Sequence, residues 1–243
     1  MSKIDNPLEL AAVAAEAYQA CYDASLQAVI VYGSAAGEDF DSERSDINLL
    51  IVLDNVTLDA VEKSTAIQNK GLKKRFARPV FMDHAYINRS LDAFPIEFFN
   101  MQHCYSVLVG EDVLGHLEIT RNDLRLQAER ELKGKWLHLM QDWPAVKDHR
   151  KRLQDLLVVS LGDFTAVFRA LLHVQKQPVA QDRKALWDAV SQVYALEVNP
   201  FGAVQTAAIR GDKKKMREVF VDYVRAIEIL SEKVDQLPRE ESL

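Results

Sequence analysis

The residues between positions 31 and 54 hold the side chains in this sequence that are best placed for chemistry. An apolar stretch ends in Gly33-Ser34, a polar loop follows, and a second apolar stretch begins at Asp46, Ile47 and Asn48. Glycine allows a ligand to approach the backbone closely, and backbone amides together with a serine hydroxyl can hold phosphate oxygens. Gly33 and Ser34 are therefore candidate phosphate-binding residues.

Asp46 and Asn48 are candidate ligands of a metal ion beside that phosphate. Because side chains alternate along a strand, residues two apart project from the same face. Magnesium prefers oxygen ligands and commonly shares its coordination shell with substrate phosphates. A metal held here would stabilise negative charge while an oxygen nucleophile displaces pyrophosphate.

This segment resembles the signature of the nucleotidyltransferase superfamily, which has the polymerase-β-like fold. The likeness rests on Gly33-Ser34 and, after eleven intervening residues, on Asp46-Ile47-Asn48 ahead of an apolar strand. Aminoglycoside nucleotidyltransferases are similar in layout as well, with an α/β domain before a helical domain. The resemblance implies that Gly33, Ser34 and Ser45 bind the nucleotide, and that positions 46 and 48 bind Mg²⁺. It also implies an NTP co-substrate, with ATP as the first choice.

The resemblance further implies a third carboxylate, on a later strand, that completes the metal site or acts as a base. Glu97 is the preferred candidate, because it lies in "PIEFFNM" (95–101), which reads as a strand, and a carboxylate among apolar residues needs a partner. The alternative is that Glu97 is an edge-strand residue facing water. Asp83 and Asp92 are rivals, although Asp83 reads as a helix cap and Asp92 as part of an exposed helix end.

Asn48 departs from the family pattern, which has an acidic residue at this position. An amide oxygen can still coordinate a hard cation, but one negative charge is lost. Two hypotheses follow. In the first, the protein uses Mg²⁺ and Asp46, Asn48 and Glu97 to transfer a nucleoside monophosphate from an NTP to a hydroxyl of a small molecule or a protein. In the second, it is a catalytically impaired, nucleotide- or partner-binding regulatory module. The loop also offers substitute carboxylates, namely Glu38, Asp39, Asp41 and Glu43.

The elements that must position these residues can be read from the apolar patterns. Asn6, Pro7 and Glu9 predict the start of an amphipathic helix over 7–22. The continuous apolar runs 26–32 and 47–53 predict strands covered on both faces. A helix is expected over 57–77, strands over 79–82 and 95–101, and a helix from Asp83 to Leu91. Residues 107–109 are expected to continue the sheet.

From about residue 118 onward only helical patterns remain. Helices are expected over about 118–143, 146–176, 182–197 and 212–236, with a short turn at 202–209. The sequence thus predicts an α/β (α+β) nucleotidyltransferase-like domain with a short mixed sheet, residues 1–117, and an all-α helical bundle, residues 118–243. The apolar stripe of the bundle is also a candidate surface for homo-oligomer formation.

Charge and composition narrow the expected partners and location. Residues 1–117 hold 9 Lys and Arg against 17 Asp and Glu, a net charge of −8, whereas the rest of the chain carries +2. An acidic half without a basic stripe argues against nucleic acid as a partner and permits cationic small molecules as acceptors. No apolar run approaches the ~20 residues needed to span a bilayer. The N-terminus does not read as a secretory signal, and with two cysteines the expected location is the cytoplasm.

Overall fold

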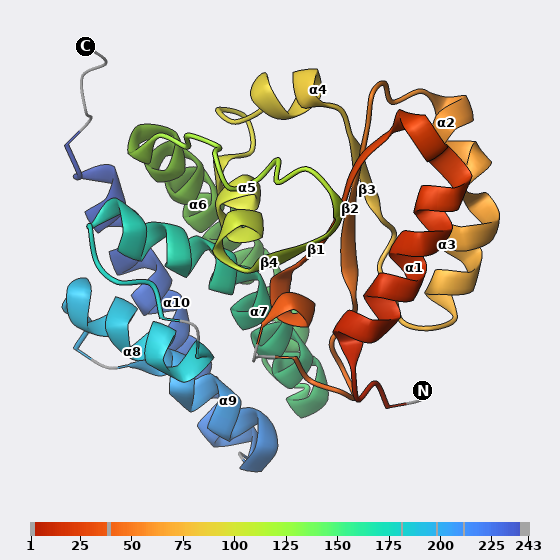
Figure 1. Cartoon of the computed structure of the whole chain (residues 1–243). Helices are drawn as coiled ribbons and strands as arrows, with labels where there is room; N and C mark the ends of the chain where they lie inside the picture. The colour runs from red at the N-terminus through yellow and green to blue at the C-terminus, as the bar shows by residue number, and fades with distance from the viewer. Residues whose placement is uncertain (1–2, 38–39, 181, 198, 211, 239–243) are drawn as a thin grey trace. The chain divides into compact units, whose positions relative to one another are not determined.

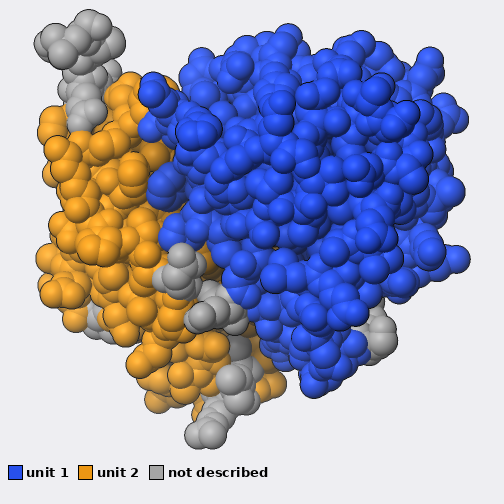
Figure 2. Space-filling model, viewed as in Figure 1, with its two compact units in different colours: residues 1–119 blue, residues 120–243 orange. Residues whose placement is uncertain are grey.

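The chain divides into two compact units, residues 1–119 and residues 120–243 (Figure 2). The computed structural model describes residues 3–37, 40–180, 182–197, 199–210 and 212–238. Unit 1 contains the sheet and unit 2 is helical in its described residues (Figure 1).

The described part of unit 1 contains a four-stranded sheet with the strand order β3-β2-β1-β4. Its strands are β1 (Leu26–Tyr32), β2 (Asn48–Leu53), β3 (Val80–Met82) and β4 (Tyr105–Gly110). Strand β1 pairs antiparallel with both β2 and β4, whereas β2 and β3 run parallel. The sheet is therefore mixed, and the strands predicted at 26–32, 47–53, 79–82 and 107–109 are confirmed.

Both faces of β1 and β2 are buried, as their continuous apolar runs predict. One face packs under α1, α2 and α3, and its buried strand residues are Val29, Val31, Leu49, Ile51 and Leu53. The other face packs under α4 and α5, and its buried strand residues are Ala28, Ile30, Leu50 and Val52. The helices therefore cover the sheet on both sides (Figure 1).

The first helix of unit 1 begins as its sequence predicts. Helix α1 (Pro7–Tyr22) is capped by Asn6, whose Oδ1 accepts from the Glu9 amide at 3.1 Å while its amide group donates to the Glu9 carboxylate. A single-turn 3₁₀ helix, η1 (Asp23–Ser25), leads from α1 into the sheet.

The helix predicted over 57–77 is two shorter helices, α2 (Leu58–Lys63) and α3 (Thr65–Leu72). The break falls at Ser64, which is fully buried and whose hydroxyl donates to the Val61 carbonyl at 3.1 Å. Serine side chains that bond to nearby backbone groups compete with the helical pattern, and a pattern of apolar residues does not reveal this. Helix α4 (His84–Asn88) is capped by Asp83 as predicted but ends earlier than Leu91.

The strand predicted at 95–101 is wrong, because these residues belong to helix α5 (Pro95–His103). Pro95 occupies the first helical position, where its missing N–H is not needed and its fixed φ suits a helix. The buried side chains of Pro95, Phe98 and Met101 are spaced by three residues, which is a helical and not a strand period. Glu97 is consequently a helix residue.

Unit 2 consists, in its described residues, of five helices. They are α6 (Arg121–Val146), α7 (Arg150–Val174), α8 (Arg183–Val193), α9 (Pro200–Arg210) and α10 (Lys213–Asp235). Helix α6 continues past the end predicted at Pro144, which is exposed. The turn predicted at 202–209 is part of a full helix, because Phe201 and Val204 are completely buried in the core.

An aromatic cluster forms part of the core of unit 2. Phe164 and Phe168 of α7 stack with ring centroids 5.7 Å apart, and Phe201 and Tyr223 contact them from α9 and α10. Helix α7 is long and apolar enough to cross a membrane by length and composition alone, but 61% of its most apolar stretch is buried inside the structure. Such burial is typical of the core helix of a globular unit.

Candidate active site

Gly33 turns the chain sharply where β1 ends. The residue has a φ of +74°, which glycine adopts without steric strain, and it begins the 3₁₀ turn η2 (Gly33–Ala36). The first amide groups of a helical turn have no partner inside the turn, so they can bind an anion. Ser34 is half-buried in this turn, and Ala35 anchors it in the core. The turn therefore has the groups expected of a phosphate-binding loop.

Cys104 is hydrogen-bonded to the first residue of this turn. The Gly33 amide donates to the Cys104 carbonyl at 2.8 Å, and a Cβ added to Gly37 would lie 2.7 Å from the Cys104 sulfur. Cys104 directly follows the last residue of α5 and precedes β4. The turn is therefore fixed by both the backbone and the side chain of a residue seventy positions away.

Asn48 lies directly beside this turn. It is the first residue of β2 and pairs with Tyr32, the residue before Gly33. An added Cβ on Gly33 would lie 3.5 Å from Asn48 Nδ2. The antiparallel pairing thus brings the glycine turn together with the residue at the second metal-ligand position of the signature. The amide nitrogen, which is a hydrogen-bond donor, is the side that faces Gly33.

On the β1 side of Asn48, the paired residues across the sheet are tyrosines. Tyr32 pairs with Asn48 on one side and with Tyr105 on the other. Burial raises the pKa of Tyr32, and burial together with a hydrogen bond to Asp112 raises the pKa of Tyr105. Both hydroxyls therefore stay protonated at neutral pH and can serve as hydrogen-bond donors.

Asp46 follows a compact loop that closes on itself. Asp41 Oδ1 accepts from the amides of Glu43 and Arg44, and the Ser45 hydroxyl accepts from the Asp41 amide at 3.0 Å. The hydroxyl of Ser45 is therefore engaged within the loop. The Asp46 side chain is 60% exposed, and its Oδ1 lies 3.9 Å from Nε of the buried Arg75. Of the other loop carboxylates considered, Glu38 and Asp39 lie outside the described residues.

Glu97 lies on helix α5 and not on a strand. It is exposed in the first turn of α5, on the helix that covers the Asn48 face of the sheet. His103 is the last residue of α5. It directly precedes Cys104, whose carbonyl accepts the hydrogen bond from the Gly33 amide. His103 is six positions after Glu97, which corresponds to about 9 Å along the helix axis. Glu97 therefore does not enter the site by strand pairing.

Asp46 and Asn48 present the oxygen chemistry of a partial magnesium site. One carboxylate and one carboxamide suit a hard cation that draws its remaining ligands from phosphate and water. Among the described residues, no group of three His, Cys, Asp or Glu is arranged to hold a metal ion. The donor set fits a magnesium ion shared with a nucleotide, and it does not fit a closed metal site made by the protein alone.

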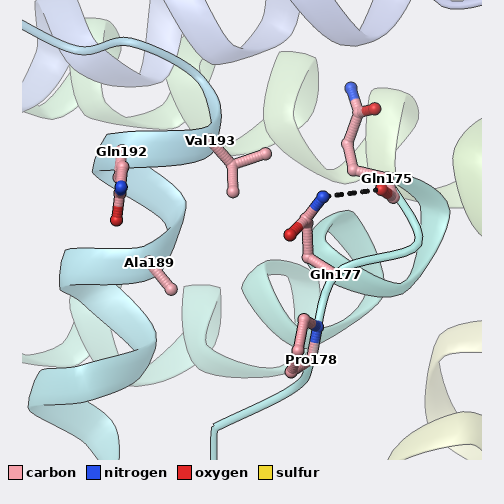
Figure 3. A pocket seen from close by; sticks show the side chains of 6 residues that line it. All are labelled: Gln175, Gln177, Pro178, Ala189, Gln192 and Val193. Atoms are coloured by element: carbon pink, nitrogen blue, oxygen red, sulfur yellow. Dashed lines mark hydrogen bonds between the residues drawn. The ribbon is translucent and has the colours of Figure 1, made fainter.

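Unit 2 contains a pocket with different chemistry (Figure 3). It has a volume of about 550 Å³ and lies where α7 and α8 end. Its lining residues are Gln175, Gln177, Pro178, Ala189, Gln192 and Val193. The side-chain amide of Gln177 donates to the backbone carbonyl of Gln175 at 3.3 Å. Three carboxamides without a titratable side chain supply neither an acid, a base nor a charged metal ligand.

Comparison with known proteins identifies a similar solved structure. No family model matches the sequence, and no curated protein matches it. The crystal structure of spectinomycin adenyltransferase AAD(9) from Enterococcus faecialis with ATP and spectinomycin superposes with a TM-score of 0.55 and 11% sequence identity. The match covers 95% of this chain and 98% of that chain. The two chains share a fold.

This match confirms the predicted resemblance to aminoglycoside nucleotidyltransferases at the level of the fold. It also confirms the predicted fold class, an α/β layer with a short mixed sheet followed by a helical region.

Two residues of the site have no role in the sequence analysis. Arg75 lies near the end of the helix expected over 57–77, and Cys104 is one of the two cysteines counted in the sequence. Their contacts connect segments that are thirty or more residues apart, and no local pattern marks such contacts. A single buried arginine beside exposed Lys73 and Lys74 is visible only in the structure.

Proposed function

We propose that this protein transfers a nucleoside monophosphate from an NTP to a hydroxyl group of a small molecule or a protein, in a Mg²⁺-dependent reaction. The observation that carries this proposal is the position of Asn48 beside the Gly33 turn, two residues after Asp46. The fold shared with an adenyltransferase supports the reaction class, and the ATP in that crystal structure makes ATP the first nucleotide to test.

The proposed roles follow from the chemistry of each side chain. Gly33 and Ser34 hold phosphate oxygens, and Ser45 contributes by shaping the loop ahead of Asp46. Asp46 and the oxygen of Asn48 hold the magnesium ion, which when bound stabilises the charge of the departing pyrophosphate. The acceptor oxygen attacks the α-phosphorus, the bond from that phosphorus to pyrophosphate breaks, and a base takes the hydroxyl proton. Glu97 is the proposed base or third ligand.

The proposed acceptor is a hydroxyl-bearing small molecule first and a protein second. The neighbouring structure holds spectinomycin, and the net charge of −8 on residues 1–117 suits a cationic acceptor. Cys21 and Cys104 are not joined by a disulfide, which agrees with the proposed location in a reducing cytoplasm.

The first experiment is a thermal-shift screen of the four NTPs with and without Mg²⁺. A ligand that binds only the folded state raises its apparent stability, so ATP with Mg²⁺ should raise the melting temperature. Pyrophosphate release in the presence of candidate acceptors then tests transfer. A melting temperature that no NTP changes, with or without Mg²⁺, contradicts the proposal.

A second function, nucleotide or partner binding without turnover, is favoured by one specific feature of the site. Asn48 is neutral, and the positive Arg75 lies beside Asp46, so the site holds less negative charge than two carboxylates would supply. The variant Asn48→Asp separates the two functions. Transfer by the wild type, enhanced in the variant, supports the enzyme. Transfer that appears only in the variant identifies the native protein as a binding module.

A further inference from the structure

Arg75 joins the end of the α3 segment to the loop that carries Asp46. The side chain is only 7% exposed, whereas its neighbours Lys73 and Lys74 are exposed. Burying a guanidinium group costs free energy unless its N–H groups donate hydrogen bonds to partners inside the protein. The contacts of this one arginine therefore show what holds it in place.

Within the described part of the chain, the side chain of Arg75 contacts the segment that leads into β2. Arg75 Nη1 donates to the Ser42 carbonyl at 2.8 Å, and Nη2 donates to the Ser45 carbonyl. Its Nε lies 3.9 Å from Asp46 Oδ1. The guanidinium thus binds the backbone carbonyls of Ser42 and Ser45 and lies near the Asp46 carboxylate that follows them.

The backbone of Arg75 holds the same segment. The Ile47 amide donates to the Arg75 carbonyl at 3.0 Å, and the Ala77 amide donates to the Ile47 carbonyl at 3.0 Å. Arg75 itself has a φ of +64°, a conformation that non-glycine residues rarely adopt. Such strained residues persist only where the surrounding structure holds them, and they are frequent at functional sites.

We propose that Arg75 is a positioning residue that fixes the direction of the Asp46 carboxylate. This inference rests on the proposed nucleotidyl transfer, because it gives Asp46 its role as metal ligand. Arg75 acts through Asp46 and through the loop backbone, since its own N–H groups are directed at the loop carbonyls. A residue that follows a loop is otherwise placed less accurately than a residue within a strand.

The charge of Arg75 has a second consequence. Asp46 and Arg75 carry opposite charges and Asn48 is neutral, so this group of three has no net formal charge. These three residues by themselves therefore attract a divalent cation weakly, whereas a triphosphate brings four negative charges of its own. The metal should consequently bind in the presence of ATP and hardly at all without it.

The test uses the full-length protein and Mn²⁺ as a spectroscopic substitute for Mg²⁺. Electron paramagnetic resonance measures Mn²⁺ bound to the protein alone and to the protein with ATP. Steady-state kinetics separate kcat from the KM for ATP, and circular dichroism measures the melting temperature. The variants are Arg75→Met, which removes charge and donors, and Arg75→Lys, which keeps the charge. Lys74→Met is the matched control for loss of a nearby exposed charge.

Arg75→Met should weaken Mn²⁺ binding to the ATP complex at least tenfold and lower kcat at least tenfold, with the KM for ATP changed less than twofold. Arg75→Lys should restore part of both losses, and Lys74→Met should behave as wild type. In the Asp46→Asn background, Arg75→Met should have no further effect on Mn²⁺ binding, because residues that act as a unit are non-additive.

Two results would overturn the inference. One is a folded Arg75→Met protein with unchanged Mn²⁺ binding and kcat. The other is an additive effect in the Asp46→Asn background, which would show that Arg75 serves stability only. If Arg75→Met does not fold, Arg75→Lys supplies the same comparison. Failure of the proposed function has a different signature, namely a wild-type protein that binds ATP neither with nor without Mn²⁺.

Discussion

At the scale of single residues, Gly33 and Gly110 provide a matched pair of glycines with positive φ. Gly33→Ala introduces strain of about 1 kcal/mol and a Cβ at ordinary contact distance from Asn48. Gly110→Ala would place a Cβ 1.8 Å from the Gln27 carbonyl oxygen, so the backbone must move at a cost of about 3 kcal/mol or more. Only Gly33 lies in the proposed phosphate-binding turn.

Gly33→Ala should therefore lower the melting temperature by a few degrees and abolish most of the ATP-induced thermal shift. Gly110→Ala should lower the melting temperature further. ATP with Mg²⁺ should nevertheless still raise the melting temperature of this variant. Differential scanning fluorimetry with and without ATP and Mg²⁺ measures both. An unchanged ATP response in Gly33→Ala would remove Gly33 from the phosphate site.

The contact of Gly33 with Asn48 could be anticipated from the sequence, whereas the surroundings of Asp46 could not. Two apolar strands joined by a polar loop readily pair, and the pairing brings the end of one beside the start of the other. Arg75 comes from a segment about thirty residues later and acts through loop carbonyls, which every residue possesses. The sequence therefore identifies the polar residues where the two strands meet the loop. It does not identify Arg75, the cationic side chain proposed to position Asp46.

At the scale of elements, the accuracy of a prediction from the sequence depends on whether the spacing of apolar residues distinguishes a strand from a helix. The run at 26–32 is apolar and rich in β-branched residues apart from Gln27, and its strand bounds are confirmed. The run at 95–101 is equally short and apolar, but Pro95 makes it a helix, so the setting predicted for Glu97 is wrong. Short apolar runs leave this ambiguity, and only tertiary packing resolves it.

Helix α7 carries a histidine that makes stability depend on pH. Burial lowers the pKa of His173, and the positive charge of Arg121 lowers it further. The unfolded chain binds the proton near the ordinary value of about 6.5. Because the unfolded state binds this proton more readily, the contribution of neutral His173 is complete above about pH 6.5 and is lost as the pH falls toward the folded-state pKa.

His173→Gln should reduce the loss of stability between pH 7.5 and pH 5.5. Urea denaturation at both pH values measures the change in the free energy of unfolding. The same exchange at His138, which is exposed on α6, is the control for removing a histidine charge from the surface. If the pH dependence of His173→Gln equals that of the wild type, another group causes it.

At the scale of the whole molecule, the residues proposed to bind the nucleotide belong to one of the two compact units. Each unit has its own buried core, and the residues proposed to bind the triphosphate and metal, Gly33, Ser34, Asp46 and Asn48, all belong to unit 1. A defect in the core of unit 2 should therefore affect folding of that unit more than nucleotide binding.

Phe168→Ala tests this division. Phe168 is fully buried, stacks on Phe164 and lies 4.6 Å from the Phe201 ring, so its truncation should cost about 3–5 kcal/mol within unit 2. Differential scanning calorimetry should show a transition at lower temperature for unit 2, while ATP with Mg²⁺ still stabilises unit 1. Ile30→Ala, in the sheet core, should have the opposite pattern. A single transition that shifts equally in both variants would show that the units unfold together and that binding cannot be assigned to one of them.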